Sequence, residues 1–455
     1  MSSSSSPLWL WLWCFFIIAI SPSVESRGDG DECWGRRIHI RKLPPRFNLD
    51  LLRNCSQFRP IYPSFCPHLA NHGLGPTTHN RTLSWHRTDP SMLELLFHRR
   101  LLDYPCLTPD PLLADAIFLP YYSSLDALPF LFGPATNSSP FHGLPLFDHL
   151  TRIHRPDLWL RRGGHDHFLV MARPAWDFSQ SPDAEPLVWG TSFLKLPQFY
   201  NVSALIIESR PTPYQEQAIP YPTSFHPSTP HLLHSWIRRV RRSRRTTLML
   251  FAGGGGSIGS NPNIRRSIRL ECNNGIDRAN YDDDDDDDDN VYYEKVCEFV
   301  DCSGGVCEHD PIRYMRPMLE TNFCLQPPGD TPTRRSTFDS FLAGCIPVFF
   351  EDLSARRQYG WHLPEEEYGE FSVTIAKEDV VWDGVRIVDV LRRIPEEEVR
   401  RMRERVIELM PRLIYRKHGV SSNVGWGGIK DAFDIAVEGV LERIRNRLLK
   451  FNYSA

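Results

Sequence analysis

The sequence predicts an α/β protein built from two doubly wound domains, and three observations support this fold class. The chain has 455 residues, which is more than one hydrophobic core ordinarily holds, since cores stop growing at about 250–300 residues. Short apolar runs alternate with longer connections, as parallel strands with helices on the sheet faces require. The alternation stops once, in a Pro-rich stretch at 211–230, and then begins again.

The first domain is predicted at 33–235 from four strand candidates. Each candidate is a short run rich in Ile, Leu, Val or Phe, which is typical of a strand buried on both faces. The runs lie at 37–40, 115–119, 167–171 and 203–207.

The second domain is predicted at 236–425, with a C-terminal helix in 426–455. The basic segment 236–245 that opens the domain is interpreted as a solvated helix face or an interdomain surface. Strands are expected at 247–251, 323–326 and 346–350, and helices at 265–272, 334–343, 396–410 and 429–449. Two such halves in succession predict a cleft at the carboxyl ends of the strands.

The N-terminus is divided into a short tail at 1–7, an apolar segment at 8–20 and a polar stem at 21–32. The apolar segment is shorter than the roughly 20 residues that span a bilayer, and its length matches the apolar core of a signal peptide. Whether it is an uncleaved anchor or is removed, the rest of the chain is expected to enter the secretory pathway.

Glycosylation sequons and cysteines agree with this compartment. The five Asn-x-Ser/Thr sequons are at Asn54, Asn80, Asn137, Asn201 and Asn452. Of the 11 cysteines, one lies in the apolar segment, and the remaining even number predicts disulfide bonds. A zinc site at Cys297, Cys302 and Cys307 is the alternative, but no histidine pair stands at the usual spacing.

The charge balance does not suggest a general nucleic-acid binder. The formal net charge is -4 and the sequence pI is about 6.5, with both signs mixed along the chain. The acidic stretch 282–290 is interpreted as a mobile insertion in a surface loop, because adjacent carboxylates repel one another. It contains an Asp-x-Asp pattern, as does 29–31, but neither follows a strand, and no metal site is predicted.

The most informative segment is 322–348. It predicts a strand, a turn that its prolines and glycine keep from being helical, a helix and a second strand. Thr331 or Thr333 can cap the helix. A helix N-terminus that follows a strand is an anion site, because its free amides and the positive end of its dipole point at the ligand.

Three side chains of this helix suit a sugar nucleotide. Arg334 and Arg335 can hold phosphate through charge-assisted hydrogen bonds. Asp339 lies four residues after Arg335 and shares its helical face. One turn beyond a phosphate site, its carboxylate can accept hydrogen bonds from ribose hydroxyls. An ordinary surface helix with an Arg–Asp pair is the alternative for these residues taken singly.

With Gly344 to Val348 directly after it, this segment resembles the sugar-nucleotide signature of exostosin-type glycosyltransferases of family 47. The run from Cys324 to Asp330 is similar to that of the plant xyloglucan galactosyltransferase branch. The resemblance extends in order over most of the chain, through 35–38, 43–48, 51–55, 118–122, 125–126, 163–168 and 358–364.

The resemblance implies a GT-B fold in which the C-terminal domain holds the nucleotide sugar and the N-terminal domain faces the acceptor. It also implies inversion at the anomeric carbon, no obligatory metal or other cofactor, and a single-pass type II anchor in the Golgi membrane with a lumenal catalytic domain. The expected reaction is transfer of galactose from UDP-galactose to a xyloglucan side chain or a related hemicellulose. Galacturonosyl or arabinosyl transfer, and a non-catalytic subunit of a polysaccharide synthase complex, are the alternatives.

One segment departs from the family pattern. After Phe251-Ala252, where relatives carry glycine, proline and arginine, this chain has Gly253 and Gly254 within a run of four glycines. Glycine amides can bind phosphate in a backbone nest, although a flexible loop explains them equally well. Arg265 or Arg266 is expected to supply the missing cation.

The base and the acceptor site are predicted in the first domain. An inverting transfer needs a base for the acceptor hydroxyl, and Asp166 is ranked first, with His167 beside it and His165 as a further candidate. Tyr121, Tyr122 and Asp126 are predicted to form an acceptor platform. The alternatives are a buried loop that these polar side chains satisfy, and core packing of the tyrosines.

Overall fold

The computed structural model describes most of the chain from residue 31 onward. The described residues are 31–53, 55, 65–78, 84–132, 143–181, 190–254, 263–275, 293–303, 307, 311–419 and 426–454. The described helices and strands all lie in one compact unit, Gly35–Ala455. The predicted boundary at 236 stays a prediction.

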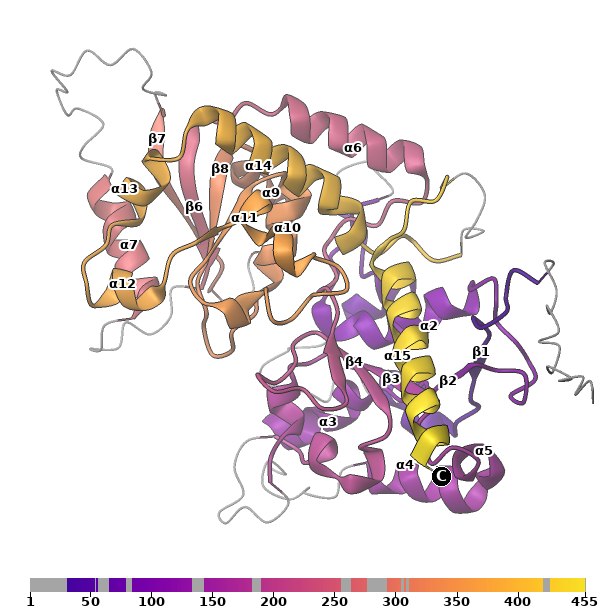
Figure 1. The fold of residues 1–455 in the computed structure, drawn as a ribbon. Coiled ribbons are helices and arrows are strands. Elements are labelled where there is room, and N and C mark those ends of the chain that lie inside the picture. The colour runs from indigo at the N-terminus through magenta and orange to yellow at the C-terminus, as the bar shows by residue number, and fades with distance from the viewer. Residues whose placement is uncertain are drawn as a thin grey trace, which may run out of the picture. The chain divides into compact units, whose positions relative to one another are not determined.

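A first parallel sheet takes its strands from the first half of the chain (Figure 1). They are β1 (Ile38–Ile40), β2 (Ala116–Phe118), β3 (His167–Met171), β4 (Ser203–Ile206) and β5 (Glu216–Ala218), in that spatial order. The four predicted strands are confirmed. Among these five strands only β5 was missed, because its Glu-Gln-Ala sequence has no apolar run. The order never reverses among these described strands, so the prediction of double winding is wrong for this sheet.

A second parallel sheet takes its strands from the second half. They are β6 (Thr247–Gly253), β7 (Lys295–Asp301), β8 (Thr321–Gln326), β9 (Ile346–Phe349) and β10 (Val373–Thr374), and their spatial order is β10-β9-β8-β6-β7. Here β7 pairs with one edge of β6 and β8 with the other. The strand order therefore reverses at β6, as the prediction of double winding requires.

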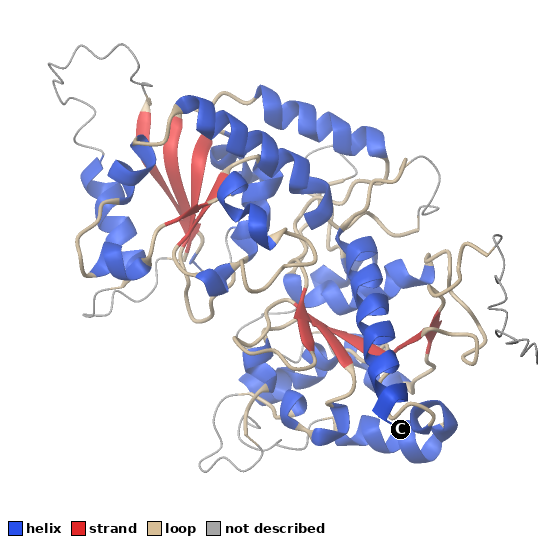
Figure 2. Cartoon of the chain, in the orientation of Figure 1, coloured by secondary structure: helices blue, strands red, loops and turns tan. Residues whose placement is uncertain are grey.

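Helices surround both sheets (Figure 2). In the first half they are α1 (Leu49–Arg53), α2 (Leu93–Leu102), α3 (Ser123–Phe132), α4 (Leu144–Asp148) and α5 (Pro156–Leu160). In the second half they are α6 (Pro230–Arg242), α7 (Ile264–Gly275), α9 (Pro311–Leu319), α10 (Arg335–Ala343), α11 (Tyr368–Phe371), α12 (Lys377–Val381), α13 (Ile387–Arg392), α14 (Glu396–Leu409) and α15 (Ala432–Ser454).

Two groups of helices cover the second sheet. Helix α10 contacts both α9 and α14, and these three helices pack on β6, β8 and β9. Helices α7, α12 and α13 form a separate group on β6 and β7. On α6, Trp236 and Val240 are buried in the core that also contains Leu342 of α10 and Ile407 of α14. The arginines of α6 between these positions are exposed, which confirms the interpretation of this basic segment as a solvated helix face.

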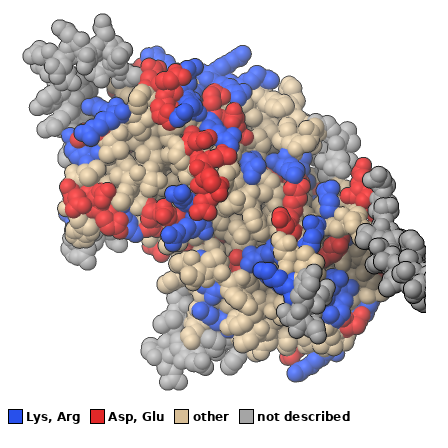
Figure 3. Space-filling model, viewed as in Figure 1, with Lys and Arg blue, Asp and Glu red and all other residues tan. Residues whose placement is uncertain are grey.

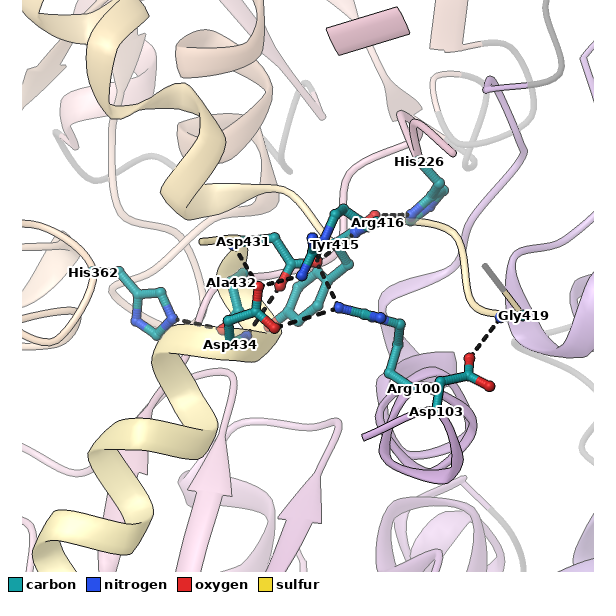
Figure 4. A network of polar contacts seen from close by, with 10 residues as sticks. All are labelled: Arg100, Asp103, His226, His362, Tyr415, Arg416, Gly419, Asp431, Ala432 and Asp434. Atoms are coloured by element: carbon teal, nitrogen blue, oxygen red, sulfur yellow. Dashed lines mark hydrogen bonds and ion pairs between the residues drawn. The ribbon is translucent and has the colours of Figure 1, made fainter. Parts of the chain in front are cut away.

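The C-terminal helix α15 packs on β4 of the first sheet. A buried polar network at its start joins segments far apart in sequence (Figure 4). A nitrogen of Arg100, on α2, lies 3.2 Å from Asp431 and 3.6 Å from Asp434. Nε of Arg416 lies 3.1 Å from Asp431. Two guanidinium groups therefore balance two carboxylates, as charges removed from water require.

Disulfide bonds confirm the prediction made for the cysteines. Four of the bonds are Cys55–Cys66, Cys272–Cys297, Cys302–Cys307 and Cys324–Cys345, and Cys33 and Cys106 are disulfide-bonded as well. They engage all three cysteines of the alternative zinc site, so that alternative is wrong. Among the described residues, no three His, Cys, Asp or Glu side chains are grouped to hold a metal ion.

Several expectations fall outside the described residues. These are the apolar segment 8–20, the acidic stretch 282–290, most of 29–31 and the sequons at Asn54, Asn80 and Asn137. Within the described part, no helix has the length and apolar character to cross a bilayer. On the face drawn in Figure 3, basic and acidic side chains are interspersed, in agreement with the mixed charge of the sequence.

Candidate active site

A cavity of about 770 Å³ lies at the carboxyl ends of the second sheet. Its lining includes Phe251 to Gly254 at the end of β6, Cys302 just after β7 and Pro327 just after β8. These three strands are the ones between which the strand order reverses. In open α/β sheets ligands bind outside the carboxyl ends of the strands at such a switch point, so the topology makes this cavity the candidate binding site.

The second half supplies most of the lining, including residues that the sequence predicted. Six of the seven predicted nucleotide-sugar residues line this one cavity: Gly253, Gly254, Arg265, Arg334, Arg335 and Asp339. The seventh, Thr333, is buried and does not belong to the lining. Residues from the end of β6, from α7 and from the segment 327–339 are thus brought together as expected.

Arg265, and not Arg266, supplies a cation beside the glycines. Its Nε donates a hydrogen bond to the carbonyl of Pro328 at 3.0 Å, and its guanidinium lies 5.8 Å from the centre of the Phe251 ring. Burial and the neighbouring charge of Arg334 lower the pKa of Arg265 to about 10. Of the two arginines considered from the sequence, Arg265 on α7 is thus the one that lines the cavity.

The turn before α10 brings a second cation to the same place. Arg334 is the N-cap residue of α10, in an extended conformation, and its side chain donates to Thr331 Oγ1 at 3.2 Å. Burial lowers the pKa of Arg334 as well. Two guanidinium groups whose pKa values are both lowered by burial in the same cavity are stabilised by an anion, and a diphosphate supplies one.

The predicted threonine cap is wrong. No side chain caps the N-terminus of α10, because Thr333 is engaged elsewhere: its backbone N–H and its hydroxyl both donate to Glu208 Oε2, the former at 2.9 Å. Glu208 follows β4 of the first sheet and is buried. The amides at the start of α10 are therefore not occupied by a threonine side chain, which suits an anion site.

Arg335 and Asp339 form the predicted pair on one face of α10. Arg335 Nε lies 3.5 Å from Asp339 Oδ2. Asp339 is only 3% exposed, and burial raises its pKa to about 6, against the opposing effect of Arg335 and the Tyr314 hydroxyl. Arg335 also donates to the carbonyl of Thr88 and to Ser224 Oγ, both at 2.7 Å, so its orientation is fixed from several sides.

A third part of the lining follows β3 of the first sheet. Arg173, Pro174, Trp176 and Asp177 line the cavity, and Arg173 Nε donates to Asp177 Oδ2 at 2.6 Å. Sequence reasoning missed these residues. The signal was available, since they come directly after a predicted strand, at the edge of a parallel sheet where ligands bind.

The predicted bases lie in a different environment. Asp166 is 0% exposed, and its carboxylate accepts hydrogen bonds from Arg161 at 2.9 Å and from His167 Nδ1 at 2.7 Å. His167 is equally buried, and neither residue lines the cavity. Both precede or begin β3, at its amino end. A carboxylate that does not reach the cavity is poorly placed to meet an acceptor hydroxyl there, so the geometry disfavours this assignment.

The predicted acceptor residues belong to the core of the first half. Tyr121 and Tyr122 are 1% and 2% exposed. The Tyr121 hydroxyl donates to Asp126 Oδ2 at 2.6 Å, and the Tyr122 hydroxyl lies 2.9 Å from His98 Nδ1. None of the three lines the cavity. The alternative of core packing describes these tyrosines better.

Two predicted glycosylation sites fall in the described part of the chain. Asn201 donates from Nδ2 to the carbonyl of Gly163 at 3.0 Å, and the sequon serine, Ser203, is buried in β4. The backbone at Asn452 lies in α15. Glycosylation at these positions stays a prediction.

Comparison with known proteins decides the family. Residues 32–391 match the Exostosin GT47 domain. The chain belongs to the exostosin GT47 family. It is 63% identical to a probable xyloglucan galactosyltransferase, GT19, of Arabidopsis thaliana, over 94% of this chain and 95% of that protein. It is 37% identical to xyloglucan galactosyltransferase MUR3 of the same plant, over 94% of this chain and 65% of that protein.

A third relative from Arabidopsis thaliana, xyloglucan galactosyltransferase XLT2, is 33% identical over 92% of this chain and 76% of that protein. This exostosin family member is therefore a glycosyltransferase with relatives that share nearly its whole length. The segments quoted from the sequence, from 35 to 364, lie within the matched domain.

Proposed function

We propose that this protein is an inverting galactosyltransferase that transfers galactose from UDP-galactose to side chains of xyloglucan or a related hemicellulose. The observation that carries the proposal is the cavity at the strand-order reversal, where Arg265 and Arg334 face the start of α10. The printed names of the relatives support the donor sugar and the acceptor. Both halves of the chain line the cavity, which supports a GT-B arrangement.

The donor is held by the second half. Its diphosphate meets Arg265, Arg334 and the first amides of α10, and the Asp339 carboxylate accepts hydrogen bonds from the ribose. As the bond to galactose breaks, negative charge grows on the departing UDP. Fixed guanidinium groups and a helix N-terminus stabilise that charge without reorganising, so the protein's own residues can supply this part of the catalysis.

The base for the acceptor comes from the first half. Three described carboxylates line the cavity, at Asp177, Asp330 and Asp339, and only Asp177 comes from the half that carries no phosphate-binding features. Asp177 takes the proton of the acceptor hydroxyl while that oxygen bonds to the anomeric carbon, on the face opposite the departing UDP. The product is a glycoside of inverted configuration, and UDP is released.

The proposed setting of the reaction rests on the N-terminal sequence and on the family. The apolar segment 8–20 acts as a type II signal anchor that holds the catalytic part in the Golgi lumen. There the protein would meet both the sugar nucleotide and the newly made hemicellulose, and other glycosyltransferases with which it could assemble.

The test is a transfer assay with the purified full-length chain. UDP-galactose, UDP-galacturonic acid and UDP-arabinose are each offered with xyloglucan oligosaccharides, and product masses are read beside an Arg334→Ala variant. The matched control is Arg316→Ala, whose side chain is 81% exposed on α9 and does not line the cavity. A hexose added only from UDP-galactose, kept in the control and lost in Arg334→Ala, is expected. UDP binding without transfer from any donor would indicate a non-catalytic subunit.

A further inference from the structure

Trp176 is an exposed aromatic residue in an otherwise buried turn. The turn Ala175–Phe178 follows β3, and Ala175, Asp177 and Phe178 are all buried. The Trp176 side chain is nevertheless 69% exposed and lines the cavity. An indole held in water forfeits the stabilisation that burial of so large an apolar surface gives, and on a cavity wall a bound ligand can restore that burial.

The turn that presents Trp176 is held firmly on both sides. The Ala175 N–H donates to the carbonyl of Glu208 at 2.8 Å, and the Thr191 N–H donates to the carbonyl of Asp177 at 2.8 Å. Gly190 makes the second contact possible, because a Cβ there would stand 2.7 Å from the Asp177 carbonyl oxygen. The indole is therefore preorganised, which lowers the entropy cost of binding.

The first half contributes the polar groups that a carbohydrate ring also needs. Arg173 and Asp177 flank Trp176 along the same wall of the cavity. Sugar rings present flat faces of C–H groups and an edge of hydroxyls. An aromatic face with charged hydrogen-bonding groups beside it matches both, as apolar sites with a few placed polar groups generally do.

From this wall we propose that Trp176 is the stacking platform for a pyranose ring of the acceptor oligosaccharide, with Arg173 and Asp177 beside it. The proposal rests on the proposed function and adds the acceptor's place to it. The donor features, Arg265, Arg334 and Asp339, all come from the second half. The wall that carries Trp176 is thus the part of the cavity left for the second substrate.

Glu208 connects this wall to the donor segment. Its backbone carbonyl accepts the Ala175 N–H, and its carboxylate accepts the N–H of Thr333, one residue before the N-cap of α10. One residue therefore fixes the turn of Trp176 and the approach to α10 together. The acceptor platform and the diphosphate site are thereby held in a fixed position relative to each other, as a transfer between two substrates requires.

The experiment measures steady-state kinetics of Trp176→Ala and Trp176→Phe in the full-length chain. The matched control is Trp382→Ala, whose indole is 68% exposed after α12 and does not line the cavity. For Trp176→Ala we expect the KM for xyloglucan oligosaccharide to rise about tenfold, with the KM for UDP-galactose and the Kd for UDP unchanged. Trp176→Phe is expected to recover part of the affinity.

The outcomes separate this inference from the proposed function. An unchanged acceptor KM in Trp176→Ala would overturn the inference, and so would an equal rise in the KM for UDP-galactose, which would assign the indole to the donor. If the unaltered protein transfers nothing to xyloglucan, the proposed function fails. Quenching of tryptophan fluorescence by xyloglucan, xylan and glucan oligosaccharides, compared between the unaltered protein and Trp176→Phe, then decides the acceptor platform by binding alone.

Discussion

The role of Asp339 can be tested by replacing it with asparagine. In the proposed complex its carboxylate accepts hydrogen bonds from the ribose of the donor. Hydrogen bonds to a charged group contribute about 1.5–3 kcal/mol, so Asp339→Asn is expected to weaken the binding of UDP-galactose roughly 10- to 150-fold. The Arg335 guanidinium, 3.5 Å away, keeps its contacts to Thr88 and Ser224 in the variant, so α10 should stay in place.

The pH dependence of the affinity for UDP-galactose tests the same prediction in a second way. Burial raises the pKa of Asp339 to about 6, and the ionised carboxylate is the better acceptor. The affinity of the unaltered protein should therefore fall as the pH drops below 6, whereas that of Asp339→Asn should stay level. UDP-galactose without acceptor is the right ligand, because both of its phosphates are esterified and neither has the second phosphate pKa near 6.

A 2′,3′-dideoxyribose analogue of UDP-galactose, measured by isothermal titration calorimetry with both proteins, gives a thermodynamic cycle for the contact between Asp339 and the ribose. If Asp339 binds the ribose hydroxyls, their removal should cost much less affinity in Asp339→Asn than in the unaltered protein. Asp389→Asn on α13, outside the cavity lining, serves as the control. Additive losses, or an affinity that is level across pH 6 in the unaltered protein, would refute the reasoning.

Three further predictions concern the catalytic wall and the fold. Asp177→Asn should lower kcat on the order of 10²- to 10⁴-fold with an unchanged Kd for UDP-galactose, and a kcat within a factor of a few of the original would exclude it as the base. Burial raises the pKa of Glu94 to about 8, so the unfolding free energy should fall by roughly 1.4 kcal/mol per pH unit as pH rises from the ordinary glutamate range toward 8. Urea titrations at pH 5 and 8 should show this fall, and Glu94→Gln should abolish it. An equal change of the unfolding free energy with pH in the two proteins would contradict the assignment. Gly344→Val should lower the thermal midpoint more than Gly384→Val, because both have positive φ but only at Gly344 does an added Cβ meet the Val240 side chain; equal losses would leave the backbone cost as the sole cause.

Much of the fold could be predicted because its signals are local. Seven of the strands are apolar runs, and α14 and α15 follow clear helical patterns. The missed strands β5 and β10 are short, and the apolar residues of the missed strand β7 are interrupted by Glu298. All three form because neighbouring strands offer them edges to pair with. Which sheet α15 packs on was not foreseeable, since it depends on contacts with residues more than 200 positions away.

The two walls of the cavity also differ in how far their residues could be predicted from local sequence. The donor wall is the part of the lining that comes from the second half, and much of it lies in the single segment 327–339. Arg334, Arg335 and Asp339 could therefore be identified together. The acceptor wall is the part of the lining that follows β3, from Arg173 to Asp177. Its residues can be identified only when it is known which end of β3 faces the cavity. Asp166 stands at the amino end of that strand and Asp177 beyond its carboxyl end, and only the second end opens onto the ligand site.

The disulfide between Cys324 and Cys345 ties the donor wall to the conditions in which the chain folds. Cys324 lies in β8 and Cys345 just before β9, so the bond encloses every donor contact from Pro327 to Asp339 in one covalent ring. Closing a ring of this size lowers the conformational entropy of the unfolded chain, which stabilises the folded protein by about 3 kcal/mol. Protein made in a reducing cytosol would have all the residues of the donor wall but would lack this disulfide. The protein for every assay above should therefore be produced under oxidising conditions.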